Sequence, residues 1–209
     1  LTGLANRNHF HDLVSEACAT ASKNHTPFGL AFIDLDRFKQ VNDINGHAAG
    51  DCLLGEAANR IRAALPEQAL LARLGGDEFA VIVPFGPTRT EAIERLAEAL
   101  IATVAQPVHF GELELETTIS AGISRTAPEV QTDIHAQLHM ADIAMYHAKR
   151  NGRNRYAWFE PNMESEQRFR SEIAAGIRRG VPLGEFVPYY EKQIDLESGT
   201  IAGFEMLAR

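Results

Sequence analysis

The chain has 209 residues, of which 45% are hydrophobic and 23% charged, and its formal net charge at pH 7 is -8. These values are typical of a globular protein, and the negative charge argues against a nucleic-acid partner, because neutralising phosphates needs clustered Lys and Arg. No apolar run is long enough to cross a bilayer, and Cys18 and Cys52 have no metal-ligand spacing, so we expect a soluble, reduced, cytoplasmic segment, with any membrane anchor of a parent protein outside it.

Helical and strand patterns alternate along the first three quarters of the chain. Apolar residues at helical spacing predict a helix over residues 8–23, and the apolar run at 28–35 predicts a buried strand. The segment 36–50 is polar and interrupted by glycines, and a second helical stripe runs from Asp51 until Pro66 stops it. Residues 69–74 and 79–84 have the pattern of two strands joined as a hairpin.

The same alternation continues with a predicted helix at 88–104, a strand at 113–124 and a helix at 134–149. A sheet that contains a hairpin cannot be all parallel. The order of elements therefore predicts an α/β (α+β) sandwich, in which a central mixed sheet is flanked by helices.

The character of the sequence changes after Trp158. A polar helix is predicted at 162–179, and two strand-like runs at 186–194 and 200–207 are joined by a turn at 197–199. We therefore divide the chain into a first domain, residues 1–157, and a second segment, residues 158–209.

Two pairs of acids stand where the edge of a sheet is expected. Asp34 and Asp36 alternate at the end of the predicted strand 28–35, and Asp77 and Glu78 lie at the bend of the hairpin. If the hairpin lies beside that strand, Asp34 and Asp77 converge, and their like charges need a proton or a cation between them. Oxygen ligands without His or Cys favour Mg²⁺, or the similar Mn²⁺, completed by the phosphates of a nucleotide. The alternative is a strand end that simply reaches water.

The glycines before the second acidic pair allow two interpretations. Gly75 and Gly76 tolerate positive φ and let a ligand approach the backbone closely. The same dipeptide also suits a plain hairpin turn.

Further polar residues are candidates for contacts with a nucleotide. Asn42 and Asp51 have side chains that can hydrogen-bond to the edge of a purine, but both residue types also cap helices. Lys149 and Arg153 gather where a predicted helix ends, so they either complement the helix dipole or neutralise a triphosphate.

Several spaced motifs resemble the GGDEF domains of the diguanylate cyclase family. The motifs are LTGLANR at 1–7, FIDLDRFKQVNDINGHAAGD at 32–51, RLGGDEF at 73–79, TISAGIS at 118–124 and ADIAMYHAKRNGRNR at 141–155. The resemblance implies a domain that binds GTP with Mg²⁺ and, as a homodimer, makes cyclic di-GMP.

The resemblance also implies roles for individual residues. Metal ions would be held by Asp34, Asp77 and the backbone carbonyl of Leu35, with Glu78 supporting the metal site or proton transfer. The substrate would be bound by Arg37, Phe38, Lys39, Lys149 and Arg153 at its phosphates, by Asn42 and Asp51 at guanine, and by the space beside Gly75 and Gly76.

One site of the family is missing from this sequence. The product-inhibition motif of the family, Arg-x-x-Asp, falls on Pro66 and Ala69. We therefore expect no feedback inhibition through that site, because neither side chain can clamp the guanine or phosphate of the product.

The last forty or so residues resemble the beginning of an EAL domain, the cyclic di-GMP phosphodiesterase family. The signature reads Glu205-Met206-Leu207 in place of Glu-Ala-Leu, and Tyr190-Glu191-Lys192 stands where Tyr-Gln-Pro is usual. A barrel needs its other strands, so this fragment alone is expected to hydrolyse nothing.

Two functional hypotheses follow. The first is a diguanylate cyclase module from a protein that joins GGDEF and EAL domains, and the intact RLGGDEF motif favours it. The second is a GTP-binding regulatory module that controls an attached EAL phosphodiesterase.

Overall fold

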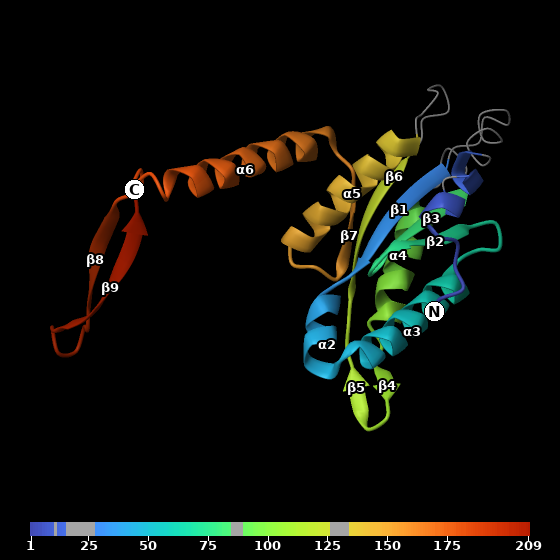
Figure 1. The fold of residues 1–209 in the computed structure, drawn as a ribbon, viewed down its shortest axis with the longest axis horizontal. Coiled ribbons are helices and arrows are strands. Elements are labelled where there is room, and N and C mark those ends of the chain that lie inside the picture. Colours follow the sequence, from blue (N-terminus) through green and yellow to red (C-terminus); the bar gives the residue numbers. More distant parts are fainter. Residues whose placement is uncertain (11, 16–27, 85–89, 126–133) are drawn as a thin grey trace. The chain divides into compact units, whose positions relative to one another are not determined.

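The computed structural model describes residues 1–10, 12–15, 28–84, 90–125 and 134–209, and the chain divides into two compact units, Leu1–Met163 and Glu164–Arg209. Figure 1 shows the first unit as a sheet covered by helices and the second as a helix followed by a two-stranded ribbon. Each unit is described by itself.

A five-stranded mixed sheet forms the centre of the first unit (Figure 1), in the order β2-β3-β1-β6-β7. Neighbouring strands are antiparallel except β6 and β7, which are parallel. The strands are β1 (Phe28–Leu35), β2 (Leu70–Gly75), β3 (Glu78–Pro84), β6 (Ile119–Arg125) and β7 (Arg155–Trp158).

The central strand β1 is almost wholly buried because helices cover both faces of the sheet. On one face, Leu30 and Phe32 pack with Met145 of α5 (Ile134–Arg150) and with Phe10. On the other face, Ile33 and Leu35 pack against α3 (His47–Ala64) and α4 (Thr90–Val104). The alternation of side chains along β1 therefore places Asp34 on the α5 face.

A glycine allows α5 to lie close to the sheet. A Cβ atom at Gly122 of β6 would lie 1.9 Å from the carbonyl oxygen of Ala141 and 2.1 Å from the backbone nitrogen of Met145. These are backbone atoms of α5, so any larger residue would force the helix away from the sheet and from the acids at its edge.

Most predicted elements are confirmed, with four differences. The polar segment 36–50 contains a helix that we did not predict, α2 (Phe38–Asn45), and β7 was also missed. The predicted strand 113–124 is two strands, β5 (Leu113–Leu115) and β6, and β5 pairs with the unpredicted β4 (Val108–Phe110) in a separate hairpin. The predicted helix 8–23 is helical at residues 7–10 and 12–15, and its remaining part lies outside the described residues.

The C-terminal elements follow the prediction closely. Helix α6 (Pro161–Gly180) is followed by an antiparallel ribbon of β8 (Pro188–Ile194) and β9 (Ile201–Ala208). Phe169, Ile173 and Ile177 on α6 and most apolar side chains of the ribbon are exposed within this unit. None of the described helices is both long and apolar enough to cross a membrane.

Candidate functional site

The two acidic pairs meet at one end of the sheet. Asp34 on β1 stands opposite Glu78 on β3 in the strand register, and the N–H of Leu35 donates to the carbonyl oxygen of Asp77 at 3.2 Å. The hairpin therefore lies directly beside β1, the arrangement on which the predicted convergence of Asp34 and Asp77 depended.

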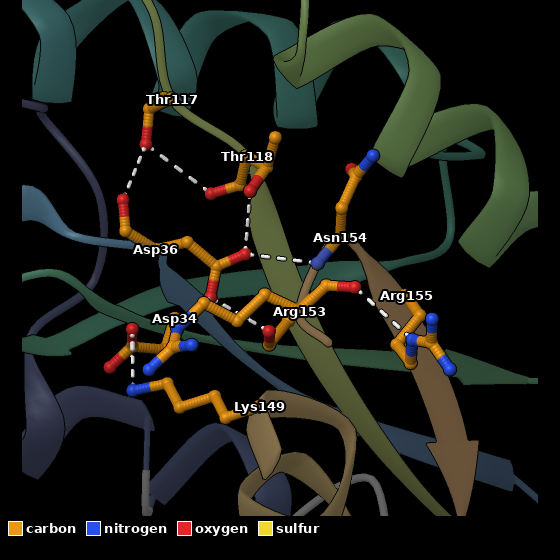
Figure 2. A network of polar contacts seen from close by, with 9 residues as sticks. Asp34, Asp36, Thr117, Thr118, Lys149, Arg153, Asn154 and Arg155 are labelled. Atoms are coloured by element: carbon orange, nitrogen blue, oxygen red, sulfur yellow. Dashed lines mark hydrogen bonds and ion pairs between the residues drawn. The ribbon is translucent and has the colours of Figure 1, made fainter. Parts of the chain in front are cut away.

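Asp34 is a buried acid held in an unfavourable environment. The residue is 7% exposed, and burial, together with the negative charges of Asp77 and Asp36, raises its pKa from the ordinary 3.8 to about 6. Lys149 near the end of α5 opposes this increase, because its Nζ lies 2.7 Å from Asp34 Oδ1 (Figure 2). One cation contacts Asp34, yet the ionised form remains destabilised.

The hairpin bend is open on the side of the glycines. Gly76 has a φ of 51°, in the left-handed region that favours glycine, and a Cβ atom added at Gly75 or Gly76 would meet nothing within 4 Å. The guanidinium of Arg73 donates from Nε and from a terminal nitrogen to the Gly76 carbonyl oxygen, at 3.0 and 2.8 Å. The bend is thus held in shape while space is left beside it.

Glu78 has partners that we did not predict. Arg7 lies 3.5 Å from the Glu78 carboxylate and also donates to the Leu74 carbonyl oxygen at 3.2 Å. Burial raises the pKa of Glu78; Arg7 opposes this, and the neighbouring charge of Asp142 on α5 adds to it. Burial also raises the pKa of Asp142. Arg7 lies in the motif LTGLANR and Asp142 in the motif ADIAMYHAKRNGRNR, both quoted above. Their membership of these motifs is the signal that could have identified them.

Asp36 differs from Asp34 in its surroundings. It is 4% exposed and accepts hydrogen bonds from the hydroxyl groups of Thr118 and Ser120 and from the Asn154 N–H. The end of β1 therefore carries one acid facing a lysine and one acid surrounded by hydrogen-bond donors.

Asn42 and Asp51 lie on consecutive helices. Asn42 is half-buried on α2, and Asp51 is exposed on α3. A Cβ atom at Gly50 would lie 1.9 Å from Asn42 Oδ1, so the Asn42 side chain lies directly over Gly50. The capping alternative is wrong for both residues, because the N-cap positions are Arg37 and Gly46 and neither makes a side-chain cap hydrogen bond.

The predicted phosphate-binding residues lie at the start of α2 and at the end of α5. Arg37 has a φ of 59° and precedes the first turn of α2, which contains Phe38 and Lys39. A helix N-terminus presents unpaired N–H groups that favour an anion. The ammonium group of Lys149 forms an ion pair with Asp34, and Arg153 Nε lies 4.0 Å from Asp36 Oδ1. Figure 2 shows both cations next to the two acids.

The donor set at Asp34 and Asp77 fits Mg²⁺ better than a transition metal. Among the described residues, no group of three or more His, Cys, Asp or Glu side chains is arranged to hold a metal ion. Two carboxylates and a backbone carbonyl leave half of an octahedral shell to water and phosphate oxygens, as Mg²⁺ prefers. The destabilised charge of Asp34 is a further reason to expect a cation there.

Comparison with known proteins gave consistent matches. A family model described as "Diguanylate cyclase, GGDEF domain" matches residues 1–155. Over its whole length the chain is 36% identical to the bifunctional diguanylate cyclase/cyclic di-GMP phosphodiesterase MucR of Pseudomonas aeruginosa, of which it covers 30%. It is 34% identical to the cyclic di-GMP phosphodiesterase PdeR of Escherichia coli, of which it covers 31%. The chain thus spans about a third of the length of these curated relatives.

The fold was also found among solved structures. The GGDEF domain of TpbB, also called YfiN, from Pseudomonas aeruginosa aligns with a TM-score of 0.75 and 38% identity, over 80% of this chain and 96% of that domain. This agreement extends to the mixed sheet and its flanking helices.

Proposed function

This chain belongs to the diguanylate cyclase family of GGDEF domains, and we propose on that basis that it condenses two GTP molecules into cyclic di-GMP. The observation that supports this most is the meeting of Asp34 and Asp77 beside the open glycine bend. Asp34 is buried and its ionised form is destabilised, although Lys149 contacts it. Such an acid has little structural use, but it suits a site that binds a cation together with an anionic substrate.

In this proposal Mg²⁺ is held by Asp34, Asp77 and the carbonyl oxygen of Leu35. When bound, it supplies positive charge that stabilises the attacking oxygen and the leaving pyrophosphate. The residues of the chain hold and orient the substrate around that position, and no covalent intermediate with the protein is needed.

Two groups of residues orient GTP in this proposal. Asn42 and Asp51 hydrogen-bond to guanine, since the amide and the carboxylate match its donors and acceptors. The triphosphate binds at the N-terminus of α2, at Arg37, Phe38 and Lys39, and to the side chains of Lys149 and Arg153. Lys149, which contacts Asp34 in this structure, would bind a phosphate oxygen when Asp34 holds the metal ion.

The reaction forms two phosphodiester bonds. In each, the 3′-hydroxyl of one GTP loses its proton and bonds to the α-phosphorus of the other GTP. The bond between that phosphorus and the oxygen bridging to the β-phosphate breaks, and pyrophosphate leaves from the attacked GTP. We assign acceptance of that proton to Glu78, which Arg7 helps to keep ionised. Because each domain holds one GTP, the reaction needs two domains facing each other, and a two-fold homodimer satisfies this requirement.

A second candidate function is regulatory binding of GTP. PdeR is named a phosphodiesterase, yet it is similar to this chain over all 209 residues, and the second unit carries the residues that resemble the start of an EAL domain. In this alternative the first unit binds GTP and controls an attached phosphodiesterase without making product.

One experiment separates the two candidates. The protein is incubated with GTP and Mg²⁺ at concentrations at which light scattering shows dimers, and products are separated by chromatography. Formation of cyclic di-GMP supports the cyclase. GTP binding by a demonstrated dimer without any product would contradict the cyclase and favour the regulatory role.

A further inference from the structure

We propose that Asp36 is a positioning residue, which fixes the turn at residues 151–154 and thereby orients Arg153 toward the site. The part that concerns nucleotide binding rests on the proposed function, whereas the part that concerns the turn does not. The sequence pairs Asp36 with Asp34, but the structure gives the two acids different surroundings.

The carboxylate of Asp36 is surrounded by donors (Figure 2). Its Oδ2 accepts from the Thr118 hydroxyl at 2.7 Å and from the Asn154 N–H at 3.1 Å. Its Oδ1 accepts from the Ser120 hydroxyl at 2.8 Å and lies 4.0 Å from Arg153 Nε. Burying a carboxylate costs free energy unless hydrogen-bond donors replace its lost hydration. Both oxygens are already engaged, so Asp36 is poorly placed to bind a metal ion, in contrast to Asp34.

The backbone of Asp36 is fixed as well. Its N–H donates to the Thr118 carbonyl oxygen at 2.8 Å, and its own carbonyl oxygen accepts from the Thr117 hydroxyl at 3.1 Å. The side chain therefore projects from a rigid position at the end of β1, against the start of β6. It can act as an anchor for a less regular segment.

The turn after α5 is the segment that needs an anchor. Gly152, Arg153 and Asn154 have φ values of 112°, 60° and 49°, and positive φ is unfavourable for Arg and Asn. Three hydrogen bonds hold these residues: from Arg153 N–H to the Ala148 carbonyl oxygen at 3.2 Å, from Arg155 Nε to the Arg153 carbonyl oxygen at 3.1 Å, and from Asn154 N–H to Asp36. Asp36 supplies the one that connects the turn to β1.

Arg153 depends on this turn, and Lys149 does not. The Arg153 side chain is 47% exposed and its ion pair with Asp36 is at the limit of contact, so its direction is set mainly by the backbone that carries it. Lys149 lies within the last turns of α5, where helical hydrogen bonds fix the backbone. Lys149 is therefore an internal control for effects transmitted through Asp36.

Two substitutions separate the roles of charge and of the hydrogen bond. In Asp36→Asn, the amide oxygen can keep the Asn154 N–H while the NH₂ group faces Ser120, so the turn is retained and the attraction for Arg153 is lost. In Asp36→Ala, both contacts are lost. Ser120→Ala is the matched control, because it removes a hydrogen bond to Asp36 but leaves the contact with Asn154.

The first measurement needs no ligand. Amide hydrogen exchange of Asn154 is followed by NMR in the metal-free protein. We expect at least tenfold faster exchange in Asp36→Ala and little change in Asp36→Asn and Ser120→Ala, while amides in the interior of α5 stay protected in all variants. Wild-type protection of Asn154 in Asp36→Ala would overturn the proposal. If Asp36→Ala does not fold, rapid exchange of Asn154 in the folded wild-type protein overturns it instead.

The second measurement uses α,β-methylene GTP with Mg²⁺. We expect Asp36→Ala to bind it about fivefold more weakly, and Asp36→Asn, which keeps the turn, to bind nearly as the wild-type protein does. The double variant Asp36→Ala with Arg153→Ala should bind as Arg153→Ala alone does. Independent, multiplying effects of the two substitutions would contradict action through Arg153. If the wild-type protein does not bind the analogue, the proposed function and action on nucleotide binding fail together, and the exchange experiment still decides the role in the turn.

Discussion

Replacing Asp34 with Asn should stabilise the metal-free protein. The pKa of Asp34 rises from 3.8 to about 6 on folding, which destabilises its ionised form by about 3 kcal/mol in the folded state. A raised carboxyl pKa means that the folded state binds the proton more tightly than the unfolded state. The contribution of Asp34 to stability is therefore lowest above pH 6, and about half of the lost stability returns when the pH falls to 5.

The assay is urea unfolding of the first unit, monitored by far-UV circular dichroism, at pH 7.5 and pH 5 in EDTA. We expect Asp34→Asn to be more stable than the wild-type protein at pH 7.5, by up to about 3 kcal/mol, and less so at pH 5. Added Mg²⁺ should stabilise only the wild-type protein. A variant less stable than wild type at pH 7.5 would show that the contact with Lys149 outweighs the burial of charge, and would refute the reasoning.

Three other predictions concern the nucleotide. Gly50→Ala should displace the Asn42 side chain, because the new Cβ would lie 1.9 Å from its Oδ1. In competition binding, the preference for GTP over ITP should then fall severalfold, while thermal stability is retained. Lys149→Ala should weaken binding of α,β-methylene GTP with Mg²⁺ about tenfold, as loss of one phosphate contact implies, whereas Lys149→Arg should retain part of it, as calorimetry can show. Cyclic di-GMP added to the GTP turnover assay should not inhibit through the position of Pro66 and Ala69, and noncompetitive inhibition that disappears in Pro66→Gly would contradict this.

The elements that the sequence predicts well are those with a strong apolar period. The run at 28–35 is buried on both faces, and the stripe that begins at Asp51 faces a core, so their patterns are unambiguous. Helix α2 was missed because none of its residues is buried, and it is bounded by Arg37 and Gly46, whose positive φ values no pattern marks. Strand β7 has only four residues and forms by pairing with β6.

Only part of the candidate site can be predicted from the sequence. The sequence predicts the approach of Asp34 to the hairpin only if the hairpin lies beside strand 28–35, and the structure supplies that pairing. The partners of Asp36 and Glu78 cannot be predicted in this way. Asn154 lies 118 residues from Asp36, and Arg7 lies near the start of the sequence, far from Glu78. Such contacts depend on how α5 and the N-terminal residues pack on the sheet, and local periodicity carries no information on that packing.

The most direct test of the account is production of cyclic di-GMP from GTP by the wild-type protein and by Asp77→Ala, at equal and demonstrated dimer concentration. The account predicts product with Mg²⁺ for the wild-type protein, none in EDTA, and a loss of at least a hundredfold in the variant with its fold intact. Undiminished turnover by Asp77→Ala would contradict the assignment of the site, and the absence of product from a dimeric wild-type protein that binds GTP would contradict the proposed activity itself.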